Sequence, residues 1–124
     1  MTDRIDRRSG KYHVVHMFSA MLLIASFSVP ANAADANSQA KMQLGREVFT
    51  KLAAPNCGIC HALKDAGTTG EIGAKLEELK PTASQVAEAV RKGVGAMPPF
   101  EGKLTEAQIQ AVAYYVSQAA RKGN

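Results

Sequence analysis

The chain has 124 residues, enough for one small domain, and its 15 Lys and Arg against 11 Asp and Glu give a net charge of +4. This small excess offers no support for nucleic-acid binding, which needs a concentrated basic stripe. A domain of this size without tryptophan is short of core, and such folds often need a metal or cofactor to be stable.

Residues 1–33 have the pattern of a signal peptide. Basic residues between positions 4 and 11 precede an apolar run over 14–29, and Ala31-Asn32-Ala33 offers the small residues that a signal peptidase requires. The run has 16 positions, fewer than the roughly 20 of a membrane-spanning helix, so we expect cleavage after Ala33 rather than a membrane anchor. Removing this leader, with four basic and two acidic residues, leaves 91 residues of charge +2. We therefore expect a periplasmic protein whose mature form is nearly neutral.

The mature chain is predicted to begin with a flexible stretch, residues 34–40, followed by a domain over 41–124. Within this start, Ser38 is expected to cap a helix that ends before Pro55. The apolar stripe of this helix is formed by four residues at helical spacing, Leu44, Val48, Phe49 and Leu52.

Both cysteines lie in Cys57-Gly58-Ile59-Cys60-His61. A redox dithiol of this spacing works beside a βαβ unit, and no such pattern surrounds it. A structural zinc site needs four protein ligands, which the mature chain does not have, and a disulfide would close too small a loop to stabilise much. C-x-x-C-H is the signature of covalent haem attachment, with Cys57 and Cys60 forming thioethers and His61 the proximal iron ligand.

The remainder of the chain predicts a loop over 67–73, a short helix within 71–80 and two longer helices. Thr82 and Thr105 each begin a capping box, Gly93 ends the first of these helices, and the second runs to about Arg121. Its predicted buried side consists of Ile109, Val112, Ala113 and Val116. No segment shows the alternation of a half-buried strand, so the predicted fold is all-α, with three to four helices.

A second axial ligand is sought among the five methionines. Three lie in the leader, and Met42 is better explained as core filler. Met97 remains, in a loop where Pro98 and Pro99 fix the backbone just beyond it. We therefore expect His61 and Met97 to be the metal ligands.

Taken together, these features resemble the class I c-type cytochromes of the short bacterial monohaem type, similar to the cytochrome c6 and c5 groups, over about residues 41–120. The resemblance implies the small cytochrome c fold around one haem c, with Gly45 permitting close approach of the last helix to the first. It also implies that Leu76, Pro98 and Phe100 contact the haem.

One departure from the family pattern is Gly73-Ala74-Lys75-Leu76, where the family usually has Gly-Pro-x-Leu. The carbonyl of Ala74 remains able to accept the proton of the proximal imidazole, but the loop loses the fixed φ of proline. We expect low hydrogen-exchange protection around Ala74.

The resemblance implies an electron-transfer protein rather than an enzyme, which exchanges single electrons transiently with redox proteins such as a donor dehydrogenase or cytochrome complex and an acceptor oxidase or reductase. The predicted docking surface is the apolar rim near Ile59, Ala62 and Pro98; Lys51, Lys64 and Lys103 are candidates for its border. Three alternatives stay open: a tightly bound haem subunit of a periplasmic dehydrogenase, a ligand-binding haem protein with an open sixth site, and an enzyme such as a peroxidase. The last is the least favoured, because the chain has a single haem motif and no distal acid–base residue.

Overall fold

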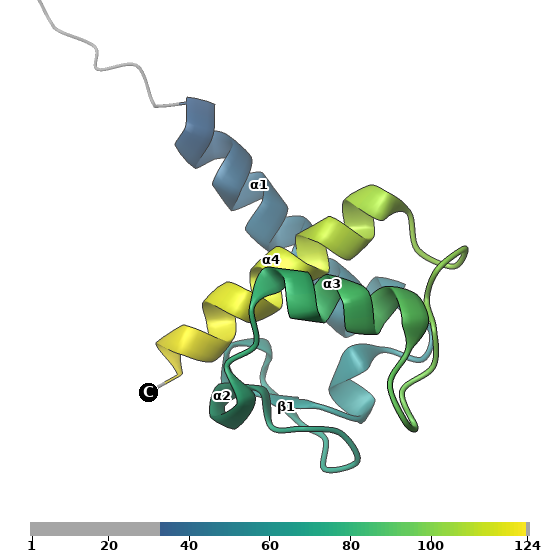
Figure 1. Cartoon of the computed structure of the whole chain (residues 1–124). Coiled ribbons are helices and arrows are strands. Elements are labelled where there is room, and N and C mark those ends of the chain that lie inside the picture. Colours follow the sequence, from purple (N-terminus) through teal and green to yellow (C-terminus); the bar gives the residue numbers. More distant parts are fainter. Residues whose placement is uncertain (1–32, 124) are drawn as a thin grey trace, which may run out of the picture.

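The structure, a computed structural model, describes residues 33–123. Its helices are α1 (Ala33–Glu47), α2 (Leu76–Leu79), α3 (Ala83–Lys92) and α4 (Glu106–Lys122), and the strands β1 (Ala62–Leu63) and β2 (Thr68–Thr69) lie between α1 and α2. Both α1 and α3 pack against α4 (Figure 1). The fold is therefore mostly helical, as predicted. The predicted signal peptide lies outside the described residues except for Ala33, and within 33–123 no helix is long and apolar enough to cross a membrane.

The first helix begins earlier than predicted. It starts at Ala33, so residues 34–40, expected to be flexible, are helical. The Ser38 hydroxyl does not cap the helix but donates to the Ala34 carbonyl at 2.9 Å, within the helix. The physical reason is the alanine content of this stretch, because alanine is the strongest helix former.

The core lies where α1 and its continuation, the π-helical turn Val48–Leu52, cross α4. A Cβ on Gly45 would collide with the Ala111 carbonyl oxygen and lie 2.5 Å from the Tyr115 Cβ, so this glycine allows the close approach expected of it. The rings of Phe49 and Tyr115 meet edge to face with centroids 6.0 Å apart. The predicted buried face of α4 is confirmed, as all four of its residues are buried: Ile109, Val112, Ala113 and Val116. Leu52, predicted to join the apolar stripe of the first helix, is 47% exposed.

Local signals set the starts of α3 and α4. Both capping boxes are present, with the Thr82 and Thr105 hydroxyls accepting from the backbone of Gln85 and Gln108. The expectation that no strand forms is wrong for β1 and β2, which pair antiparallel. Two-residue strands are too short to show alternation in a sequence, so this hairpin carried no periodic signal.

Candidate functional site

The cysteine motif forms a single tight turn. The Asn56 side chain accepts from the Ile59 amide at 3.1 Å, and the amides of Cys60 and His61 donate to the Cys57 carbonyl at 3.1 and 2.9 Å. Both cysteines are half-buried and unpaired. Burial raises the pKa of the Cys57 thiol to about 11, whereas a redox dithiol needs a thiol of lowered pKa. The Cys57 thiol is therefore not activated in the way that the attacking thiol of a redox dithiol is.

The His61 imidazole is held by the loop before α2, through Gly73 and Ala74. Its Nδ1 lies 2.9 Å from the Ala74 carbonyl oxygen, and since a carbonyl only accepts, Nδ1 carries the proton and Nε2 keeps its lone pair for a metal. Gly73 lies against the ring, where a Cβ would come within 2.7 Å of Nδ1, and its amide donates to the Cys60 carbonyl at 2.8 Å. The proximal hydrogen bond expected at Ala74 is therefore present without the proline of the family pattern.

A cavity of about 460 Å³ opens beside this turn. It is mainly apolar and is bounded by residues from α3, α4, the cysteine turn and the loops before α2 and after α3. All seven residues predicted to contact the cofactor line it: Cys57, Cys60, His61, Leu76, Met97, Pro98 and Phe100. The structure thus brings together side chains that are separated by up to 43 positions in the sequence.

Met97 is held in place by the backbone of the loop after α3. The amides and carbonyls of Val94 and Met97 exchange hydrogen bonds at 3.1 and 2.9 Å, and the Phe100 amide donates to the Val90 carbonyl at 2.9 Å. Gly93 ends α3 with φ +74°, and a Cβ there would lie 2.5 Å from the Met97 carbonyl oxygen. Met42, by contrast, packs against the core and is absent from the cavity lining, in agreement with its predicted role as core filler.

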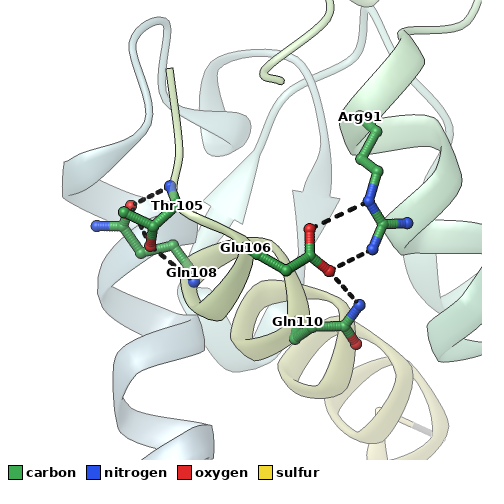
Figure 2. Close-up of polar contacts among 5 residues, drawn as sticks. All are labelled: Arg91, Thr105, Glu106, Gln108 and Gln110. Atoms are coloured by element: carbon green, nitrogen blue, oxygen red, sulfur yellow. Dashed lines mark hydrogen bonds and ion pairs between the residues drawn. The ribbon is translucent and has the colours of Figure 1, made fainter. Parts of the chain in front are cut away.

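A polar network joins the two ends of this loop. Figure 2 shows the Arg91 guanidinium on α3 bonded to the Glu106 carboxylate on α4, which also accepts from Gln110 at 2.8 Å. The Thr105–Gln108 capping box adjoins it at the start of α4. Hydrogen bonding to Arg91, above all, lowers the pKa of the Glu106 carboxyl. The Glu106 side chain is 62% exposed and that of Arg91 is 26% exposed, so this ion pair contributes little to stability.

Several residues of the cavity wall carried no recognisable signal in the sequence. Ile72, Leu79 and Val94 line the cavity although each is more than half exposed, and Gln85 adds a polar side chain. These four residues come from the loop before α2, from α2, from α3 and from the loop after α3, and they meet only in the folded chain. Of the three predicted docking residues, only Pro98 lines the cavity. Ile59 and Ala62 lie outside it; Ile59 is 56% exposed and Ala62 is half-buried.

Lys51, Lys64 and Lys103, the candidates for the border of the docking surface, are exposed. The Lys103 ammonium lies 5.9 Å from the centre of the Phe100 ring, and Phe100 lines the cavity.

These side chains fit a covalently bound haem. Two thiols, an imidazole with a free Nε2 and a thioether line one apolar cavity, which matches the attachment and axial donors of cytochromes c. Among residues 33–123 no group of three or more His, Cys, Asp and Glu side chains is arranged to hold a metal ion.

Comparison of the chain with known proteins also indicates a cytochrome c. Residues 40–116 match the model of the family described as cytochrome C oxidase, cbb3-type, subunit III. The chain is similar to cytochrome c6 of Leptolyngbya boryana, with 40% identity over 72 residues (55% of this chain and 85% of the relative). It is also similar to cytochrome c6 of a Picosynechococcus species, with 36% identity over 113 residues (82% and 88%). Among solved structures, the c-type cytochrome SorU from Sinorhizobium meliloti matches with a TM-score of 0.64 and 49% identity, over 66% of this chain and 93% of that one. The chain therefore belongs to the cytochrome c family, as a class I monohaem cytochrome with covalently bound haem c.

Proposed function

We propose that this small electron-carrying cytochrome works in the periplasm, passing single electrons between redox proteins, with His61 and Met97 as the two axial ligands of its haem iron. The observation that carries the proposal is that both side chains line the same apolar cavity as the two cysteines. When bound, haem c supplies the iron that takes up and releases the electron.

The residues of the chain provide the surroundings for that step. Cys57 and Cys60 supply the sulfur atoms of the thioethers, and the Ala74 carbonyl fixes the tautomer of His61, which keeps Nε2 available. The Met97 thioether is a soft ligand that favours the reduced metal and raises the potential. The apolar side chains around them would cover much of the haem, and ligation by both His61 and Met97 would leave no position for oxygen or a substrate.

Ligation is tested by Met97→Ala, with Met42→Ala as the matched control from the core. In optical spectra of the purified protein, Met97→Ala should remove the sulfur-to-iron charge-transfer band of the oxidised form and lower the reduction potential substantially. Met42→Ala should leave both unchanged. A Met97→Ala protein that keeps the band would overturn the ligand assignment, and ready binding of carbon monoxide by the wild-type reduced protein would favour an open sixth site instead.

Location and mobility are tested on the native protein. Mass spectrometry of the periplasmic fraction should find a chain that begins at Ala34 and carries one haem. On gel filtration of a native extract the protein should elute as a small separate species. Co-elution with a dehydrogenase would show a fixed haem subunit rather than a diffusing carrier.

A further inference from the structure

The segment after the β-hairpin turn wraps around the outside of the cysteine turn. Gly67, with φ +68°, turns the chain back, and Thr68 pairs with Leu63 across the hairpin. A Cβ on Gly70 would lie 2.5 Å from the Cys60 carbonyl carbon and 2.7 Å from the His61 amide nitrogen. The backbone of this segment therefore lies directly against the backbone of the cysteine turn.

Within this wrap, the Thr68 side chain makes two kinds of contact. Its hydroxyl donates to the His61 carbonyl at 2.9 Å and accepts from the Leu63 amide at 3.1 Å, and it is half-buried. A hydroxyl has one proton and two lone pairs, so one side chain serves both bonds. Its methyl group lies against Gly58, where a Cβ would collide with it.

We infer that Thr68 is a positioning residue for the axial imidazole. Its hydroxyl fixes the peptide groups on both sides of Ala62 and its methyl group supports Gly58 from outside, so the backbone that carries His61 is held at both ends of the turn. The Ala74 carbonyl orients the ring, while Thr68 orients the backbone to which the ring is attached. The inference rests on the proposed function in one respect, namely that His61 is the axial ligand.

The local character of the contact defines the experiment. Thr68→Val keeps the shape of the side chain and removes both hydrogen bonds, Thr68→Ser keeps the hydroxyl and removes the methyl group, and Thr69→Val makes the same change as the first variant at the exposed neighbour. Hydrogen exchange is measured by NMR on the reduced holoprotein, at the Leu63 amide, the His61 Nδ1 proton and the Val116 amide in the core of α4.

We expect Thr68→Val to speed exchange at the Leu63 amide about tenfold, the equivalent of about 1.4 kcal/mol, and at His61 Nδ1 several-fold, with Val116 unchanged. Thr68→Ser should keep near-wild-type exchange at Leu63, and Thr69→Val should keep it at all three sites. Three results would each overturn the inference. Thr68→Val could exchange at wild-type rates, Thr69→Val could speed exchange as much as Thr68→Val does, or exchange in Thr68→Val could speed up equally at all three sites, including Val116. If Thr68→Val attaches no haem, Thr68→Ser decides: normal attachment and exchange support the role of the hydroxyl, and a failure like that of valine contradicts it.

The two proposals fail separately. The spectrum of the wild-type protein shows whether His61 and Met97 bind the iron, and a negative result there leaves the exchange rates at Leu63 as a measure of the Thr68 contacts. Normal ligation in the wild type with no effect of Thr68→Val would remove the positioning role and keep the proposed function.

Discussion

Gly45→Ala tests whether the crossing of α1 and α4 depends on the absence of a side chain. Gly45 is buried, and the atoms that a Cβ would meet are the Ala111 carbonyl oxygen and carbon and the Tyr115 Cβ. These atoms belong to the backbone or lie directly on it, so no side-chain rotation can move them away. The two helices themselves must separate.

The magnitude follows from two opposing effects. Raising the distance to the Tyr115 Cβ from 2.5 Å to an ordinary contact of 3.4 Å requires about 0.9 Å of separation, and overpacking of this kind costs about 1–3 kcal/mol. Because the obstacle is backbone, we take the upper end of that range. The gain in helix propensity from glycine to alanine offsets about 1 kcal/mol. The expected net loss is about 2 kcal/mol, or a fall in Tm of about 10 °C for a domain of this size.

Denaturant and thermal unfolding of the holoprotein, followed by circular dichroism, measure this loss. Ala40→Gly provides the control, because Ala40 is exposed on the same helix and reports propensity alone, at a cost of about 1 kcal/mol. If Gly45→Ala instead stabilises the protein by about the amount that Ala40→Gly destabilises it, propensity explains both and the close-approach argument fails.

The remaining side-chain predictions concern α4 and the capping boxes. Tyr115 donates to the Asp65 carboxylate at 2.6 Å, so Tyr115→Phe should lower the free energy of unfolding by about 1.5 kcal/mol, whereas Tyr114→Phe should change it little. Burial, with the bond to Asp65 second, raises the pKa of Tyr115 above its ordinary value. The unfolded chain releases this proton near pH 10 while the folded one keeps it, so stability should fall as the pH rises above about 10, less steeply in Tyr115→Phe. A fall of equal slope in both proteins would assign it to other groups. Thr105→Ala and Thr82→Ala should each cost about 1 kcal/mol in denaturant unfolding, and unchanged midpoints would show that the caps are dispensable.

Sequence reasoning succeeded where the determinant is local. The cysteine turn and both capping boxes depend on residues within five positions of one another, and all are present in the structure. The meeting of His61 and Met97 in one cavity was reached by elimination and by family resemblance, because nothing in the spacing of 36 positions gives a distance.

The features that sequence reasoning missed depend on tertiary contacts. Thr68 lies in a stretch rich in glycine and threonine, for which the sequence predicts a loop. Its role depends on its pairing with Leu63 across the hairpin, and strands of two residues are too short for a sequence pattern to show that pairing. Leu52 follows the helical spacing of the stripe but lies in a π-helical turn, which changes the angle between successive side chains and turns it toward solvent.

The proximal loop offers a last prediction, because its hydrogen bonds are present although the family's proline is not. The Ala74 carbonyl oxygen lies 2.9 Å from His61 Nδ1, and the Gly73 amide donates to the Cys60 carbonyl at 2.8 Å. Any mobility of this loop therefore comes from the freer φ of Ala74 compared with proline and not from missing hydrogen bonds. Ala74→Pro keeps the carbonyl and restricts φ, and Gly73 tolerates the restriction that proline places on the preceding residue. Where the conformation fits, such a change stabilises by about 0.4–1 kcal/mol.

Hydrogen exchange at the Gly73 amide and the His61 Nδ1 proton should therefore slow several-fold in Ala74→Pro. Ala83→Pro is the matched control, because Ala83 is the first residue of α3, where proline is well accepted. It should add similar overall stability and leave exchange at Gly73 unchanged. Equal slowing in both variants would mean that exchange there follows global unfolding, and the argument for a locally mobile proximal loop would then have no support.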